Sequence, residues 1–177
     1  MHPHSSGSPV PYRLLSWRAL PTAAWLCCIF CLSGQSAPSS AGLSMMLSRF
    51  IAGILLAPDL FAQAAAMLGL PATPDELARS IHFLIRKAAH MTEFMILTWL
   101  AAWWLRAALD RRHACRWALL LCLAAAASDE AHQLFVPGRA GQLSDVAIDF
   151  TGGLIGMGAA ELLHRVRGRM RTKHGSR

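Results

Sequence analysis

Residues 81–105 read IHFLIRKAAHMTEFMILTWLAAWWL, an apolar stretch whose charged side chains all lie in its first half. A helix needs about 20 mostly apolar residues to cross a bilayer, and this stretch is long enough. Within it, Arg86, His90 and Glu93 are spaced i, i+4 and i+7, so a helix presents them on one face. The stretch therefore predicts a membrane-spanning helix with a polar face toward one end.

The composition of the chain also indicates a membrane protein. Hydrophobic residues make up 54% of the 177 residues and charged residues 15%, whereas soluble domains are roughly 45–50% apolar. The net charge is +7, but the 17 Lys and Arg residues lie mostly between or just outside the apolar runs. Basic residues placed in this way flank a bilayer rather than form a face that binds nucleic acid. We expect membrane lipids as partners and no nucleic acid.

Four apolar segments predict an all-α, polytopic bundle of about four transmembrane helices. The predicted spans are residues 14–34, 81–105, 114–136 and 146–164, within one transmembrane domain over 14–165. A polar tail, expected to be disordered, precedes this domain at 1–13, and a basic cytoplasmic tail follows it at 166–177. The first span could instead be a cleaved signal peptide, which would leave three spans.

The segment between the first two spans has a helical pattern of its own. Its apolar residues recur at helical spacing and share one face, while Arg49 interrupts the run and Pro58 ends it. This apolar run is shorter than the roughly 20 residues that a span requires. We expect a helix lying on the membrane surface, with an apolar face made of Leu43, Met46, Leu47, Phe50 and Ile54.

The distribution of basic residues predicts the orientation. With four spans, twelve Lys and Arg fall on the side that holds both termini and five on the other side. Cytoplasmic loops are enriched in basic residues, so both termini are expected in the cytoplasm. The predicted location is the bacterial cytoplasmic membrane, with a multi-pass topology.

Polar residues of the last three spans are expected to meet at the outer membrane edge. In SDEAHQLFVPGR (128–139), Asp129 lies one helical turn from His132 and Gln133, and in LSDVAIDFTGG (143–153), Asp145 and Asp149 share a face. The candidate catalytic residues are His90, Glu93, Asp129, Glu130 and His132. The candidate ligand-binding residues are Arg86, Lys87, Gln133, Arg139, Asp145 and Asp149.

The charges of this group do not balance. Five carboxylates face three fixed positive charges, and a charge placed deep in a span costs at least about 2.5–3.5 kcal/mol. Protonated carboxyls, charged histidines or a bound cation must therefore offset two negative charges. Because the chain has no H-E-x-x-H spacing, we expect no metal ion and no cofactor.

Simpler interpretations apply to some of these residues. Charged side chains at helix ends often only anchor a span by reaching the interface, which applies to Arg86, Lys87 and Arg139 taken singly. Gly152 and Gly156 form a G-x-x-x-G pair, which favours close packing of two helices.

Three motifs of the chain resemble the VanZ-like family. They are R-K-x-x-H-x-x-E-F from residue 86, D-E-x-H-Q-x-F-x-P-G-R from 129, and D-V-x-x-D-x-x-G-G-x-x-G from 145; F-C-L-S-G-Q-S at 30–36 is also similar. Asp149 stands where that family usually has Asn. The resemblance implies a small polytopic protein of the bacterial cytoplasmic membrane, in a family whose founding member is associated with resistance to the glycopeptide teicoplanin.

Three functions follow as hypotheses. The first is a cell-envelope protein whose outer pocket binds the head group of a phospholipid or of a lipid-linked cell-wall precursor, and which contributes to teicoplanin resistance. The second is a membrane-embedded hydrolase or transferase acting on a lipid head group, with a histidine as general base and a carboxylate beside it. The third is a proton-coupled transporter. The ligand and the oligomeric state stay open.

Overall fold

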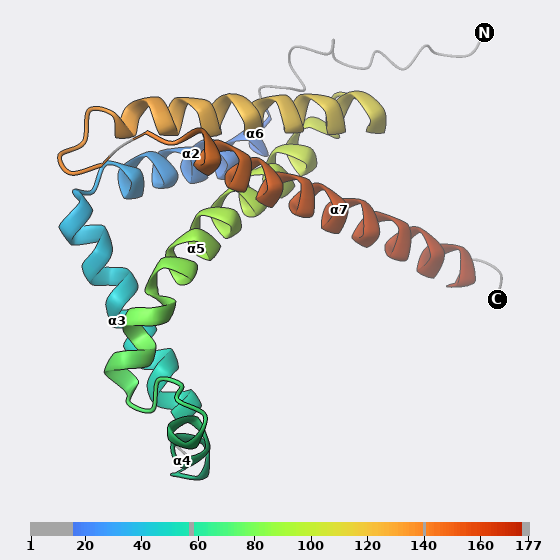
Figure 1. The fold of residues 1–177 in the computed structure, drawn as a ribbon. Coiled ribbons are helices and arrows are strands. Elements are labelled where there is room, and N and C mark those ends of the chain that lie inside the picture. Colours follow the sequence, from blue (N-terminus) through green and yellow to red (C-terminus); the bar gives the residue numbers. More distant parts are fainter. Residues whose placement is uncertain (1–15, 57–58, 140, 175–177) are drawn as a thin grey trace, which may run out of the picture.

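The ordered elements of the chain are helices, as the sequence predicts. A computed structural model describes residues 16–56, 59–139 and 141–174, and those ranges contain no strand. The helices, shown in Figure 1, are α2 (Ala19–Ser33), α3 (Ala37–Leu56), α4 (Asp59–Met67), α5 (Pro74–Leu105), α6 (Arg111–Gln133) and α7 (Leu143–His174).

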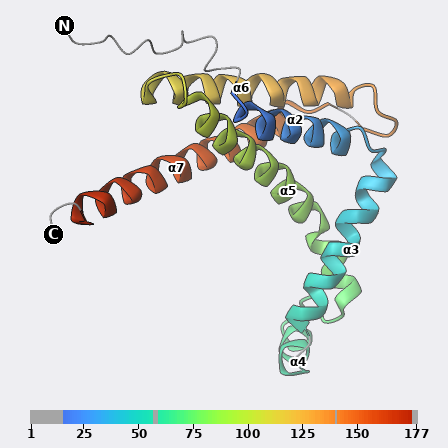
Figure 2. The same cartoon turned by 180° about the vertical axis from the view of Figure 1, so that it is seen from behind.

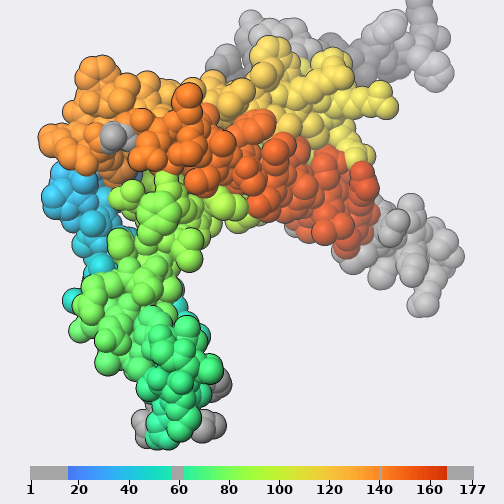
Figure 3. Space-filling view, in the orientation of Figure 1, coloured from blue at the N-terminus to red at the C-terminus, as the bar shows by residue number. Residues whose placement is uncertain are grey.

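The helices form a bundle and an arm. In the bundle, α2 and α6 run side by side, and the second half of α5 packs against both of them and against α7 (Figures 1 and 2). The first half of α5 leaves the bundle beside α3, and α4 lies at the far end of this pair. We call α3, α4 and the first half of α5 the arm. The space-filling view shows the arm standing at a steep angle to the bundle (Figure 3).

Helices α5 and α7 cross in close contact because α7 carries glycines at the crossing. A Cβ atom added at Gly152 would collide with the main-chain oxygen of Met91, and one added at Gly156 would collide with that of Met95. Only residues without a side chain allow the two backbones to approach this closely. The G-x-x-x-G pair is thus a packing seam, as its spacing predicts.

Helix α3 packs on α5 through small side chains. Ser44, Ser48 and Ala52 are buried, and Ala78 is buried on the α5 side. The large apolar side chains point the other way: Met46 and Phe50 are 68% and 66% exposed. This is the reverse of a soluble helix, whose apolar face turns inward. The outward face of α3 is therefore suited to lipid.

In the part of the chain that the structure describes, two helices are long and apolar enough to cross a bilayer. One is α3, with 20 residues, and the other is the Leu143–Val166 part of α7. Helix α2 is apolar but has only 15 residues. The length of α3 differs from the prediction, because the helix begins at Ala37, before the apolar run, and continues past Arg49. A segment expected to be too short for a span thus has the length of one.

Helix α5 begins before its apolar stretch because a capping box starts it at Pro74. The Thr73 hydroxyl accepts a hydrogen bond from the Glu76 amide, and the Glu76 carboxylate accepts one from the Thr73 amide. Reciprocal bonds of this kind satisfy amides that the first helical turn leaves without partners. The hydrogen bond with the Thr73 side chain is the main cause that lowers the pKa of Glu76 below its ordinary value, and the main-chain hydrogen bonds add to it. The capping box gives α5 the extra turns that pair with α3 in the arm.

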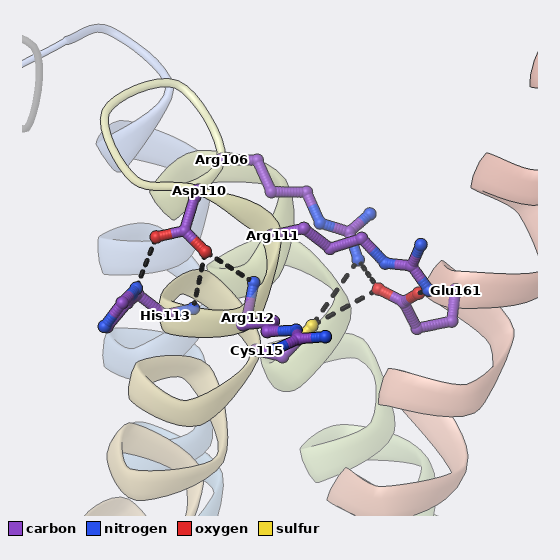
Figure 4. Close-up of polar contacts among 7 residues, drawn as sticks. All are labelled: Arg106, Asp110, Arg111, Arg112, His113, Cys115 and Glu161. Carbon is purple, nitrogen blue, oxygen red and sulfur yellow. Dashed lines mark hydrogen bonds and ion pairs between the residues drawn. The ribbon is translucent and has the colours of Figure 1, made fainter.

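The turn between α5 and α6 is tied to α7 by ion pairs. Glu161 of α7 pairs with both Arg106 and Arg111, which lie on either side of the turn (Figure 4). Asp110 caps α6 by accepting hydrogen bonds from two amides of its first turn and from the His113 ring. The His113 hydrogen bond lowers the pKa of Asp110. This cluster closes the end of the bundle that lies away from the arm.

Candidate functional site

The predicted polar residues lie where the arm joins the bundle. The middle of α5 supplies Arg86, Lys87, His90 and Glu93, and the last turns of α6 supply Asp129, Glu130, His132 and Gln133. The first turns of α7 supply Asp145 and Asp149, and Arg139 lies in the connection between α6 and α7. Three helices thus bring residues that are distant in sequence to one end of the bundle.

At the centre, one residue from each of three helices meets the others. A nitrogen of His90 and carboxylate oxygens of Asp129 and Asp149 all lie within 4.8 Å of one another. Asp129 and Asp149 are buried, with 4% and 2% of their surfaces exposed. Gln133, one turn after Asp129, donates a hydrogen bond of 2.9 Å to the Asp129 Oδ2 atom. The other oxygen, Oδ1, is buried without a hydrogen-bond partner in both aspartates.

Of the three remaining acidic residues around this centre, Asp145 and Glu130 have partners on other helices or in the connections between them. Lys87 of α5 pairs with Asp145 of α7, and both side chains are largely buried. Glu130 accepts a hydrogen bond from the main-chain N–H of Gln142, which fixes the start of α7 against the end of α6. Since Lys87 is engaged by Asp145, it is not the counter-ion of the aspartates at the centre.

Arg139 connects the α6–α7 loop to the start of the arm. Its Nε–H donates to the main-chain oxygen of Gln35, at 3.1 Å, and the Ala37 amide donates to the Pro137 oxygen. Burial lowers the pKa of Arg139 from its ordinary value, and the nearby Arg86 guanidinium lowers it further. A guanidinium stays protonated in spite of such shifts. Two positive charges are therefore held near each other in a partly desolvated place.

A cavity of about 170 Å³ opens beside these residues, between α3 and α5. Its polar wall contains Arg86, His90, Glu93 and Arg139, with Gln35 at the start of the arm. The rest of its lining is mostly apolar and comes from Leu32 of α2, Leu43 and Leu47 of α3, and Ile85 and Ala89 of α5, with Ser40 and Ser44 among them. The cavity thus combines charged and apolar lining residues, as the binding of an amphiphilic ligand requires.

The two candidate histidines have different surroundings. The Nδ1 atom of His90 lies 3.7 Å from the Glu93 Oε2 atom, one helical turn along. His132 instead stacks on Phe30 of α2, with ring centroids 4.1 Å apart. His90 thus has a carboxylate beside it, whereas His132 contributes to the packing of α2 on α6.

The contribution of α3 was missed by sequence reasoning, which placed this helix on the membrane surface. Leu43, Ser44 and Leu47 line the cavity. The available signal was the i, i+4 pair Ser44 and Ser48, since small polar residues opposite a large apolar face favour helix–helix contact.

Comparison with known proteins identifies the family. A family model described as VanZ/LLP1 matches residues 19–164, which include every candidate site residue. No curated protein and no solved structure matches the chain. The family and the two long apolar helices together indicate a membrane protein. Since the match covers most of the sequence, the chain belongs to the VanZ/LLP1 family.

Proposed function

We propose that the chain is a multi-pass protein of the bacterial cytoplasmic membrane, which binds a phosphate-bearing lipid head group in the cavity between α3 and α5. The observation that carries this proposal is the lining of the cavity, which combines Arg86 and Arg139 with the leucines of α3. Guanidinium groups bind phosphate oxygens with paired, charge-assisted hydrogen bonds. The apolar side then accommodates the first part of a lipid chain.

The proposed topology has four spans, which contain α2, the later part of α5, α6 and α7. In it α3 lies on the outer surface of the membrane, although it is long and apolar enough to cross. Both termini lie in the cytoplasm, and the cavity lies at the outer edge. The charge distribution of the sequence supports this orientation. A phospholipid or a lipid-linked cell-wall precursor can present its phosphate at that edge. Through such binding the protein would contribute to resistance to teicoplanin, an association that the VanZ family suggests.

Binding is tested with farnesyl phosphate, a short lipid phosphate, against farnesol, which has the same chain without the charge. The ligands are titrated into the purified full-length protein in detergent. We expect farnesyl phosphate to bind and farnesol to bind at least tenfold more weakly. Arg86→Ala and Arg139→Ala should each weaken phosphate binding roughly tenfold or more, because a hydrogen bond to a charged group contributes about 1.5–3 kcal/mol.

The matched control is Arg79→Ala, since Arg79 is an exposed residue of the same helix. It should leave binding within about twofold, as expected for an exposed charge outside the cavity. Thermal unfolding of each variant is measured alongside, because Arg139 also holds the main chain at Gln35. Equal binding of farnesol and farnesyl phosphate, or unchanged binding by folded Arg139→Ala, contradicts the proposal.

A cellular assay tests the link to resistance. The protein is expressed in a Gram-positive host, and growth is measured over a range of teicoplanin concentrations. We expect the wild type to raise the inhibitory concentration, and Glu93→Gln and Arg139→Ala to abolish the effect at equal amounts of membrane-inserted protein. Equal susceptibility with and without the wild-type protein would remove teicoplanin resistance from the proposal.

An enzyme is the second candidate, because His90 lies 3.7 Å from Glu93 in the cavity wall. A histidine beside a carboxylate can take a proton from water that attacks phosphorus. Farnesyl diphosphate is the test substrate: hydrolysis would break its terminal P–O bond and release inorganic phosphate. Glu93→Gln should then abolish phosphate release and retain binding. If the wild type binds farnesyl diphosphate but releases no inorganic phosphate, the enzyme is excluded and the binding function stands.

A further inference from the structure

We propose that His90, Asp129 and Asp149 bind one divalent metal ion at the centre of the bundle. The three residues come from α5, α6 and α7, and their ligand atoms lie within 4.8 Å of one another. Metal sites in helical bundles are commonly built in this way, from side chains on facing helices. The proposal goes beyond head-group binding and does not depend on it.

The geometry requires only a small closure. Around a tetrahedral ion with bonds of about 2.0–2.2 Å, neighbouring ligand atoms lie roughly 3.3 Å apart. Side chains spread over 4.8 Å reach that spacing by rotations that move each atom by about an ångström or less. The Gln133 amide already holds one oxygen of Asp129 and so orients that carboxylate.

The buried charge supports a cation at this place. One oxygen of Asp129 and one of Asp149 are buried without a hydrogen-bond partner, and both residues are more than nine-tenths buried. Two adjacent buried carboxylates repel each other and lose their hydration, and a nearby cation offsets both unfavourable effects. Among the described neighbours, Lys87 pairs with Asp145. The Arg139 guanidinium, which donates to the Gln35 main chain, is a positive charge that Asp129 shares with Glu93 and Glu130. A doubly charged ion would balance the two aspartates.

The set of donors selects the type of ion. One imidazole and two carboxylates suit Zn²⁺ or Mn²⁺ better than Ca²⁺ or Mg²⁺, which prefer oxygen ligands alone. Three protein ligands would leave a coordination position open, as in catalytic zinc sites. His90 also lines the cavity, so the open position is within reach of a molecule bound there.

Mn²⁺ is the appropriate probe, because the chain also has free cysteines at positions 27, 28 and 31 that attract Zn²⁺. The full-length protein, purified in detergent and stripped with EDTA, is titrated with Mn²⁺ without added lipid. Loss of the electron paramagnetic resonance signal of free Mn²⁺ measures binding. We expect one ion per chain in the wild type. His90→Gln and Asp149→Asn should each weaken binding at least about tenfold, a loss that removing even an outer partner of a metal ligand can cause.

Asp75→Asn is the matched control, since Asp75 is an exposed carboxylate of the arm that pairs with Arg49. It should bind Mn²⁺ as the wild type does. Stability gives a second readout. Without metal, Asp149→Asn should unfold at the same temperature as the wild type or a higher one, because it removes a buried charge. With Mn²⁺ at a concentration that just saturates the wild type, the wild type should become the more stable, since it binds the ion more tightly than the variant.

If Asp149→Asn does not fold, Asp129→Asn provides the same comparison. A wild type that binds no stoichiometric Mn²⁺, or an Asp149→Asn variant that binds it as tightly as the wild type, overturns the metal site. Since no lipid is present, neither result affects the farnesyl phosphate experiment. The two proposals can therefore fail separately.

Discussion

The indole N–H of Trp25 donates a hydrogen bond to the main-chain oxygen of Glu93, at 2.8 Å. Trp25 lies in the middle of α2, and Glu93 lies in the wall of the cavity. A helix oxygen that accepts from another helix couples the position of α2 to the site. This bond joins α2, the first helix of the bundle along the chain, to α5, which carries Arg86, Lys87, His90 and Glu93.

Trp25→Phe should therefore destabilise the protein while it retains most of the apolar packing. We expect a loss of about 1 kcal/mol, the usual contribution of one hydrogen bond. Trp117→Phe is the control, because Trp117 is 56% exposed, and it should change stability by no more than about 0.5 kcal/mol. Thermal unfolding of both variants in the same detergent provides the measurement. Equal stability of the two would mean that the bond has no net effect.

Gly156→Ala should separate α5 from α7. The new Cβ atom would collide with the main-chain oxygen of Met95, and backbone atoms cannot rotate away. We expect a loss of about 1–3 kcal/mol, as for overpacking in a core. At Gly158 an added Cβ atom meets nothing within 4 Å, so Gly158→Ala should stabilise the helix by roughly 0.5–1 kcal/mol. Unfolding temperatures that move in the same direction for both would contradict the close crossing.

The stability of the α5–α6 turn should fall in acid. The pKa of Asp110 is lowered in the folded protein, chiefly by the hydrogen bond with His113. A lowered carboxyl pKa stabilises the fold above the unfolded value, which is about 3.9 for Asp, and this contribution disappears as the pH falls through the folded value. The difference in unfolding temperature between wild type and Asp110→Asn should be largest near neutral pH. It should shrink as the pH falls below about 4 toward the pKa of the folded protein. A difference that stays constant down to pH 3 would exclude this linkage.

Reporter fusions should reveal the proposed orientation. A reporter inserted at Arg111, the first residue of α6, should respond as cytoplasmic, and one at Gly138, between α6 and α7, as external. The reason is the excess of basic residues near both termini and near the α5–α6 turn. Paired reporters that are active only on opposite sides of the membrane give the measurement. The reverse pattern would place the cavity on the cytoplasmic side.

Helical periodicity was enough to predict which polar residues of α5 lie on the same face. Arg86, His90 and Glu93 share a face by spacing, and all three line the cavity. The same spacing rule placed His132 beside Asp129, and for this residue it was too coarse. His132 lies about 60° around the helix from Asp129, because successive residues turn by about 100°. That rotation is sufficient to direct the ring to Phe30 of α2.

Other features depend on contacts that no local pattern contains. The ligand atoms of His90, Asp129 and Asp149 are neighbours only because three helices cross, so a search for ligand spacing within one helix did not indicate a metal site. The contacts that α3 makes with α5 were not predicted for a related reason. The large apolar face of α3 looks like a face that is buried in a protein or that lies on a membrane. Instead, the small side chains of Ser44 and Ser48 are buried against α5.

The apolar wall that α3 contributes also affects how a ligand reaches the arginines. Under the proposed topology, a lipid that enters beside the α3 leucines would arrive by diffusion in the plane of the bilayer rather than from bulk water. The fraction of protein occupied then depends on the mole fraction of that lipid in one leaflet, and dilution of the surrounding medium leaves it unchanged. Competition among lipids for this entrance would make the protein responsive to the composition of the membrane around it.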